Sequence, residues 1–144
     1  MILYVNACVR KDSRTKQLAE YLLSKLDGEI TEVRLSEISF PLQDESFLYR
    51  RDQLLADKRF DDPVFDLARQ FAAADQIVIA APYWDYSFPA ALKQYLEQVS
   101  VIGVTFYYTP EGIPKGLCQA KGLYYVTTTG GRTSWQSAKM KLII

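Results

Sequence analysis

The chain has 144 residues, of which 49% are hydrophobic and 24% are charged, and its 17 basic side chains balance its 17 acidic ones. This length and composition predict one packed domain over residues 1–144 and disfavour intrinsic disorder. The net charge of zero gives no support for nucleic acid or another polyanion as a partner.

Histidine is absent from the chain, which excludes catalytic arrangements that pair serine or cysteine with histidine. Its absence also disfavours a transition-metal site, and Cys8 and Cys118 have neither metal-ligand spacing nor a disulfide framework. We therefore expect no metal, and an enzyme built from this chain would depend on a bound cofactor. The apolar runs are too short to span a bilayer and no signal peptide precedes the first strand, so the expected location is cytoplasmic.

The first part of the chain alternates between strand and helix patterns. Residues 1–7 form an apolar run typical of a strand, and a polar loop follows at residues 8–15. Apolar residues at i, i+4 and i+8 spacing predict a helix over residues 13–26, which Asp27-Gly28 ends. Residues 29–35 alternate between apolar and polar side chains, as in a strand near the edge of a sheet.

The middle of the chain contains an irregular excursion and a well-defined strand. Residues 36–62 lack a clear period and predict a long excursion with one or two short helical turns. An amphipathic helix then starts at Asp62-Pro63, and residues 77–81 form the continuous apolar run of a strand buried on both faces. Pro82 ends this strand, and Pro89 starts the next helix.

The last elements complete an alternating pattern. Residues 105–108 are a short aromatic extended segment, and residues 109–116 contain two prolines and two glycines and predict a loop. A fourth strand follows at residues 121–127, and residues 127–131 form a loop of small residues after it. Strands that alternate with helices predict an α/β fold with a doubly wound parallel sheet of the flavodoxin type and strand order 2-1-3-4.

Three loops of this fold meet at the carboxyl edge of the sheet, where open α/β sheets bind ligands. The loop at residues 10–15 offers hydroxyl groups, cationic side chains and a helix N-terminus, which suit a phosphate. The loop at residues 82–86 offers three flat aromatic rings, and the loop at residues 127–131 offers hydroxyls and glycines that let backbone N–H groups approach a ring. Together they match a phosphate, a ring face and a ring edge, and thus predict flavin mononucleotide (FMN).

Each loop by itself has a simpler interpretation. Ser13 alone is best explained as a helix N-cap and Gly130-Gly131 alone as a turn. The aromatic loop alone could be a strand-to-helix turn that carries surface aromatics. The prediction of an FMN site therefore depends on the occurrence of all three loops in this order.

The sequence also resembles a known family, the flavodoxin-like NAD(P)H:quinone oxidoreductases and FMN-dependent azoreductases. The resemblance covers residues 1 to about 131, and its most specific part runs from Ala81 to Lys93 and is followed by Gly-x-Thr-Phe. The matching segments are Ser13-Arg14-Thr15 before Leu18-Ala19, Ala74-Asp75, Ala81-Pro82-Tyr83-Trp84-Asp85-Tyr86 with Pro89 and Leu92-Lys93, Gly103-Val104-Thr105-Phe106-Tyr107-Tyr108, Lys115-Gly116-Leu117, Lys121 and Thr128-Thr129-Gly130-Gly131.

This resemblance implies an FMN-dependent NAD(P)H dehydrogenase that acts on a quinone or an azo compound. In the implied ping-pong reaction, NAD(P)H gives a hydride to the flavin, the nicotinamide leaves, and the acceptor takes two electrons in its place. The first loop would hold the phosphate, the second would pass under the isoalloxazine, and the third would meet the pyrimidine end. The cofactor-binding residues expected on these grounds are Arg10, Ser13, Arg14, Thr15, Pro82, Tyr83, Trp84, Asp85, Tyr86, Thr127, Thr128, Thr129, Gly130 and Gly131.

The resemblance further implies a homodimer with active sites near the subunit interface and residues 105–108 in the wall over the flavin. Because the chain cannot place a histidine near the flavin, the proton donor would be Tyr107, Tyr108 or water, and no catalytic residue is assigned. FAD is less expected than FMN because nothing in the sequence provides extra surface for an adenosine.

The C-terminal segment departs from the family. Relatives normally continue past the Gly-Gly loop into another helix, a fifth strand and a final helix, and residues 132–144 do not resemble that continuation. We therefore expect a shortened domain without the fifth strand, an exposed edge at the fourth strand, and a second copy that compensates for the lost cover.

Three other kinds of protein with this fold are alternatives to the enzyme. A non-catalytic flavodoxin-like protein that has lost flavin and acts by association is the alternative that the C-terminal departure suggests. An electron-carrier flavodoxin is disfavoured because such carriers are usually strongly acidic and this chain is neutral. A phospho-receiver protein would need an acidic cluster after the first strand, where Asn6 and Ala7 stand instead.

Overall fold

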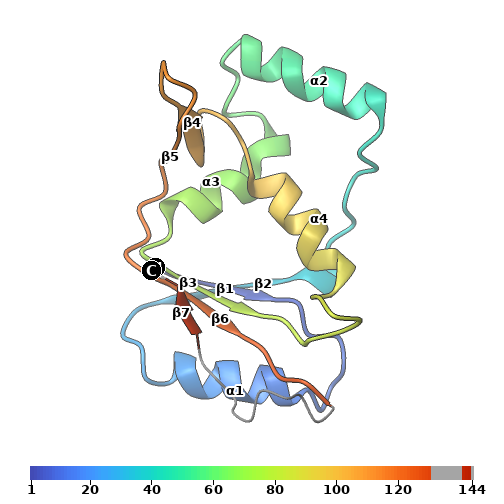
Figure 1. The fold of residues 1–144 in the computed structure, drawn as a ribbon, viewed down its shortest axis with the longest axis vertical. Coiled ribbons are helices and arrows are strands. Elements are labelled where there is room, and N and C mark those ends of the chain that lie inside the picture. The colour runs from blue at the N-terminus through green and yellow to red at the C-terminus, as the bar shows by residue number, and fades with distance from the viewer. Residues whose placement is uncertain (131–140, 144) are drawn as a thin grey trace.

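A twisted sheet forms the centre of the molecule (Figure 1). The computed structural model describes residues 1–130 and 141–143. Four strands run parallel in the order β2-β1-β3-β6, which confirms the predicted order 2-1-3-4. Their bounds are β1 Ile2–Asn6, β2 Ile30–Arg34, β3 Gln76–Ala80 and β6 Leu123–Val126.

The two central strands, β1 and β3, are buried on both faces, as their continuous apolar runs predict. Alternate residues point to opposite sides of the sheet. Leu3 and Ile77 therefore belong to the core on one face, whereas Tyr4 and Val78 belong to the core on the other. Helices must cover both faces for this arrangement to be stable.

Helices lie on both sides of the sheet, with α1 on one side and α3 and α4 on the other (Figure 1). Helix α1 spans Arg14–Leu23, α3 spans Asp66–Ala73 and α4 spans Ala90–Val99. Ala19 and Leu23 of α1 pack on one face of the sheet, and Leu92 and Tyr95 of α4 are fully buried against the other. A short 3₁₀ turn, Pro63–Phe65, precedes α3, so the predicted helix begins as a tighter turn.

The irregular excursion differs from its prediction. After the 3₁₀ turn Leu35–Glu37, it contains one three-turn helix, α2 (Glu45–Ala56), where one or two short turns were expected. No residue of α2 is fully buried. Arg51 ties this helix to α4, because its guanidinium donates hydrogen bonds to the backbone oxygens of Glu97 (3.2 Å) and Ser100 (2.6 Å).

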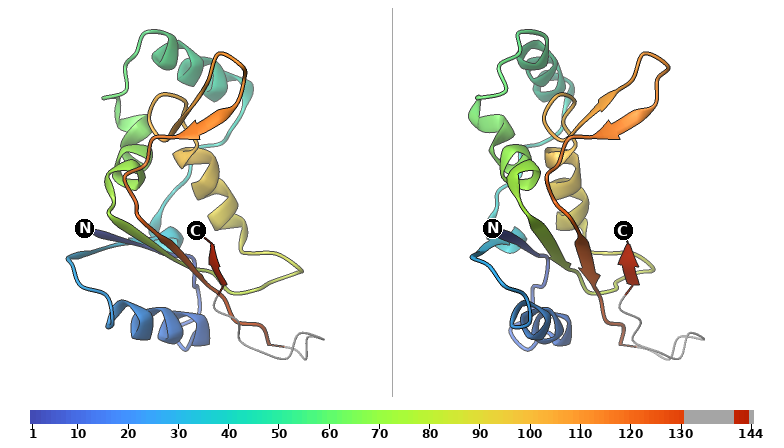
Figure 2. Two further views of the ribbon diagram at one scale, coloured as in Figure 1. Left: turned by 60° about the vertical axis from the view of Figure 1, so that its left-hand side comes forward. Right: turned by 90° about the vertical axis from the view of Figure 1, so that its left-hand side faces the viewer.

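A two-stranded antiparallel hairpin follows α4. It consists of β4 (Phe106–Tyr108) and β5 (Pro114–Gly116), and it projects at the end of the molecule opposite α1 (Figure 2). The prediction of a loop throughout residues 109–116 was therefore wrong for its last three residues. Proline and glycine give no strand signal, and β5 exists through its pairing with β4.

The edge beside β6 also differs from its prediction. A short strand, β7 (Lys141–Ile143), pairs with β6 in the antiparallel direction. The expectation that β6 would form an exposed edge was therefore wrong over Leu123–Tyr125. The three-residue β7 runs antiparallel to β6, whereas β2, β1, β3 and β6 are parallel. Among the helices that the structure describes, none is long and apolar enough to cross a membrane.

Candidate functional site

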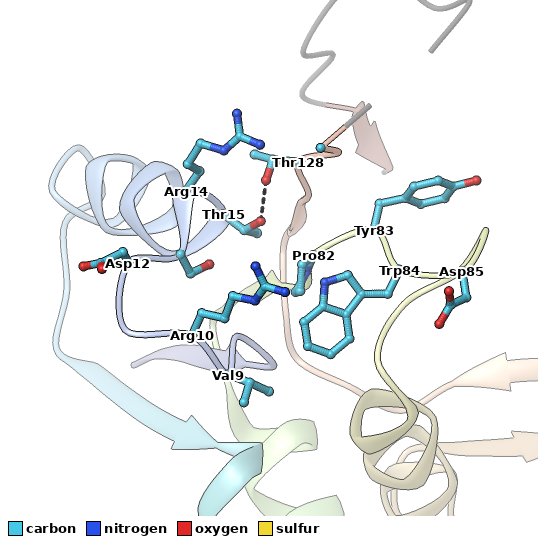
Figure 3. A pocket seen from close by; sticks show the side chains of 12 residues that line it. Val9, Arg10, Asp12, Arg14, Thr15, Pro82, Tyr83, Trp84, Asp85 and Thr128 are labelled. Atoms are coloured by element: carbon cyan, nitrogen blue, oxygen red, sulfur yellow. Dashed lines mark hydrogen bonds between the residues drawn. The ribbon is translucent and has the colours of Figure 1, made fainter. Parts of the chain in front are cut away.

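A pocket of about 570 Å³ lies at the carboxyl edge of the sheet, where the loops after β1, β3 and β6 meet (Figure 3). Its volume is within the range of roughly 300–1,000 Å³ that is common for small-molecule sites. The position agrees with the predicted switch point of the sheet. The lining residues are Val9, Arg10, Asp12, Ser13, Arg14, Thr15, Pro82, Tyr83, Trp84, Asp85, Thr128 and Gly130.

The first loop brings a helix N-terminus to the pocket. The Ser13 side chain caps α1 by accepting a hydrogen bond from the backbone N–H of Lys16 (3.2 Å). The first N–H groups of a helix have no partners inside the helix, and they carry partial positive charge. Thr15 lies in the same turn and is 1% exposed. This end of the pocket therefore offers hydroxyl and N–H donors of the kind that bind a phosphate.

Two arginines add positive charge to the same end of the pocket. Figure 3 shows Arg10 extending from the first loop toward Pro82 and Trp84, while Arg14 extends beside Thr128. Both guanidinium groups could make charge-assisted hydrogen bonds to an anion. Asp12 also lines this end, so the positive field of the pocket is partly balanced.

The second loop is a tight two-residue hairpin. Trp84 and Ser87 exchange backbone hydrogen bonds of 2.9 and 2.8 Å, and the two residues between them, Asp85 and Tyr86, have φ of +49° and +64°. Two consecutive positive φ values are typical of a type I′ turn. This conformation is costly for side chains other than glycine and asparagine or aspartate. The turn holds Trp84 in the lining of the pocket.

The third loop connects the other two. The backbone N–H of Tyr83 donates to the carbonyl of Thr128 (3.1 Å), and the hydroxyls of Thr15 and Thr128 are 2.7 Å apart. Thr128 thus contacts both the aromatic loop and the first turn of α1. Among the residues that the structure describes, none has an atom within 4 Å of a Cβ built at Gly130.

The structure brings most of the predicted site residues together and separates a few of them. Thr127, Tyr86 and Thr129 do not belong to the lining, and Gly131 lies outside the described residues. Val9 and Asp12 line the pocket but were missed, because neither residue type signals a phosphate or flavin contact; only their position between strand and cap could have indicated them. The predicted residues that line it are Arg10, Ser13, Arg14, Thr15, Pro82, Tyr83, Trp84, Asp85, Thr128 and Gly130.

Groups near the pocket are ill suited to metal binding or thiol chemistry. Within the described part of the chain, no cluster of acidic and cysteine side chains could hold a metal ion. Cys8 is buried just before the first loop, and burial raises the pKa of its thiol despite a hydrogen bond with Ser13. The thiol form of Cys8 is a weak nucleophile at neutral pH.

The donor set fits FMN on two grounds. Buried and half-buried hydroxyls, two arginines and a helix N-terminus suit its phosphate. Trp84 presents an indole 38% exposed, which suits a flat ring.

Comparison with known proteins agrees with this geometry. A family model described as flavodoxin-like fold matches residues 1–142. An FMN-dependent NADH:quinone oxidoreductase 2 from Clostridium acetobutylicum is 38% identical over 139 residues, which cover 90% of this chain and 68% of the relative. A relative from Lachnoclostridium phytofermentans with the name FMN-dependent NADH:quinone oxidoreductase is 33% identical over 137 residues, with 90% and 69% covered.

Solved structures give the same result. A Bacillus anthracis azoreductase superposes with a TM-score of 0.75 at 27% identity, over 95% of this chain and 72% of that protein. A second B. anthracis structure, an FMN-dependent NADH-azoreductase in complex with FMN, has the same TM-score at 19% identity, over 94% and 72%, and supports the fold alone. The match over nearly the whole chain and the identity to curated relatives show that the chain belongs to the family of the flavodoxin-like fold.

Proposed function

We propose that this protein is an FMN-dependent oxidoreductase that takes a hydride from NADH and passes two electrons to a quinone or an azo compound. The observation that carries the proposal is the pocket that joins the N-terminus of α1, the indole of Trp84 and the loop at Thr128. The names of the relatives, FMN-dependent NADH:quinone oxidoreductases, support the cofactor, the donor and the acceptor class. A cytoplasmic location, where a nicotinamide donor is available, is part of the same proposal.

Different residues of the pocket would bind different parts of FMN. Ser13, Thr15 and the first N–H groups of α1 would hold the phosphate, with Arg10 and Arg14 as cationic partners. Bound FMN would supply the hydride chemistry, and the protein would supply orientation and electrostatic stabilisation. The tight turn at Asp85 and Tyr86 would keep Trp84 against the ring.

The ping-pong order is part of the proposal. Donor and acceptor would enter the same open pocket in turn, because each must reach the same flavin ring. Initial rates at several fixed NADH concentrations should give parallel lines in a double-reciprocal plot. Lines that intersect to the left of the axis would indicate a ternary complex and contradict this order.

A homodimer is also proposed. The hairpin formed by β4 and β5 exposes apolar and aromatic side chains, which isolated soluble domains usually cover. A second copy would bury part of this surface, and light scattering after size exclusion should then give twice the mass of the chain. A stable monomer at micromolar concentration would contradict the proposal. The exposed side chains are Tyr107, Tyr108 and Ile113 in the hairpin and Leu117 directly after it.

One experiment tests the central proposal. The purified protein, incubated with FMN and freed of excess by gel filtration, should retain flavin absorbance that bleaches on addition of NADH without oxygen. A quinone added afterwards should restore the absorbance. Protein that elutes colourless and leaves FMN fluorescence unquenched would contradict the proposal and favour a non-catalytic protein that acts by association.

A further inference from the structure

The hydroxyl groups of Thr15 and Thr128 form a hydrogen bond between two loops of the pocket that lie far apart in the sequence. Their oxygens are 2.7 Å apart, although the residues are separated by 113 positions (Figure 3). Thr15 is 1% exposed and lies in the first turn of α1, whereas Thr128 belongs to the loop after β6. The hydrogen bond is partly buried and sets the orientation of both hydroxyls.

The position of Thr128 is fixed from two sides. Its hydroxyl meets Thr15, and its backbone carbonyl accepts a hydrogen bond from Tyr83 N–H (3.1 Å). A threonine in a helix often turns its hydroxyl back to a carbonyl of the preceding turn. Thr15 has no preceding turn, so its hydroxyl bonds across the pocket to Thr128 instead.

The direction of this hydrogen bond depends on what Thr15 contacts. In the free protein either hydroxyl can be the donor. A hydroxyl has one proton, so once Thr15 donates to an anion it can only accept from Thr128. The two hydroxyls would then form a chain that runs from Thr128 through Thr15 to the anion, and each bond in such a chain strengthens the next.

From this geometry we infer that Thr128 is a positioning residue for the phosphate of FMN, acting through Thr15. The inference rests on the proposed function. The family resemblance implies that Thr128 meets the pyrimidine end of the flavin, where it would have no effect on phosphate affinity. The hydroxyl pair directs the Thr128 side chain to the phosphate end instead, so that the third loop sets how well the first loop binds the phosphate.

The test compares FMN with riboflavin, which carries the same ring system and lacks the phosphate. Dissociation constants for both ligands are measured by flavin fluorescence quenching for wild type, Thr128→Val, Thr15→Val, the double variant and Thr128→Ser. We expect Thr128→Val to weaken FMN about tenfold, in line with the loss of one hydrogen bond in a charged network. Riboflavin affinity should change less than about threefold.

The remaining variants separate positioning from simple damage. Thr128→Ser keeps the hydroxyl and should restore the wild-type ratio of the two dissociation constants. The double variant should bind FMN no more weakly than Thr15→Val. Each substitution already breaks the same chain of hydrogen bonds, so the second one adds no further loss. Urea unfolding without flavin checks that each variant folds. If Thr128→Val does not fold, Thr128→Ala takes its place.

Three results would overturn the inference alone. These are an equal loss of FMN and riboflavin affinity in Thr128→Val, unchanged FMN affinity, or additive losses in the double variant. Failure of the wild type to bind either flavin is a different result, because it contradicts the proposed function and the inference with it.

Discussion

Trp84 and Tyr86 stand two residues apart, and the sequence gives no reason to separate them. The structure does, because the Trp84 indole lines the pocket and is 38% exposed, while the Tyr86 ring is 93% exposed and does not line it. Tyr86 instead contacts Tyr83 edge to face, with ring centroids 6.5 Å apart. Stacking energy for a flat ligand should therefore come from Trp84.

The first prediction uses this pair as a matched comparison. Trp84→Ala should weaken FMN binding by about 1–3 kcal/mol, the usual value of stacking on one aromatic side chain. Tyr86→Ala should change the dissociation constant less than about threefold, since its ring lies outside the lining. Fluorescence titration with FMN measures both. Equal losses in the two variants would show that the ring binds elsewhere on the loop.

A second prediction at the residue scale concerns Glu32, whose carboxylate accepts hydrogen bonds from the amide of Asn6 (2.8 Å) and the guanidinium of Arg34 (3.0 Å). Burial alone would raise the pKa of Glu32, but the hydrogen bonds from Arg34 and Asn6 outweigh it and hold the pKa below its usual value. A carboxyl whose pKa is lower in the folded state stabilises the fold above its unfolded pKa, about 4.3, and loses that contribution as pH falls through the folded value.

Urea unfolding at several pH values between 7 and 3 tests this prediction with Glu32→Gln. The variant should be less stable than wild type at pH 7, and the difference should shrink as the pH falls below about 4. Glu37→Gln is the control. Glu37 also contacts Arg34, at 3.5 Å, but its side chain is exposed. A difference for Glu32→Gln that stays constant across the pH range would contradict the prediction.

At the scale of elements, burial decides which ones the sequence can predict. Strands β1 and β3 and helix α4 show their burial directly as apolar patterns, and they form as expected. Helix α2 buries none of its residues fully, and only a few of its apolar side chains, such as Leu54 and Leu55, pack partly against the core, so its apolar pattern was too weak to predict its full length. Arg51 also holds this helix in place through hydrogen bonds to backbone carbonyls of Glu97 and Ser100, a long-range contact that no local pattern encodes.

For the site, too, the sequence predicts only what the local pattern and the topology determine. The order of three loops at the ends of parallel strands could be predicted, because parallel topology fixes which ends meet. The distinction between Trp84 and Tyr86 could not, because it depends on the positive φ values of the turn between Trp84 and Ser87. The contact between Thr15 and Thr128 also depends on tertiary packing across 113 positions of sequence.

Thr105 carries the third prediction, because its hydroxyl organises the segment between α4 and β4. The hydroxyl is buried, donates to the carbonyl of Val99 (2.6 Å) and accepts from the backbone N–H of Val101 (3.0 Å). Thr105→Val keeps the shape but leaves these groups unsatisfied, and it should lower the free energy of unfolding by about 1–3 kcal/mol.

Thr105→Ser is the matched control for this prediction. It keeps the hydroxyl and loses one methyl, so it should cost less than the valine substitution in urea unfolding. If valine were the milder of the two, packing of the methyl group would matter more here than the hydrogen bonds.

At the scale of the whole molecule, the pocket exists only when distant parts of the chain have come together. Its lining combines residues 9, 10 and 12–15 after β1, residues 82–85 after β3 and residues 128 and 130 after β6. An unfolded chain has no such arrangement and should not bind FMN. Ligand that binds only the folded state stabilises it by an amount that grows with the logarithm of ligand concentration.

This linkage gives the fourth prediction. FMN at about 100 times its dissociation constant should stabilise the fold by about 2.7 kcal/mol, and the thermal midpoint should keep rising as more FMN is added. Riboflavin at the same concentration should raise the midpoint less, because it leaves the N-terminus of α1 and the hydroxyl of Thr15 without a phosphate. Differential scanning calorimetry measures both series, with inorganic phosphate as the control for a nonspecific anion effect. Because three loops from across the sheet must close on one ligand, a thermal midpoint that FMN leaves unchanged would mean that they do not form a flavin site together.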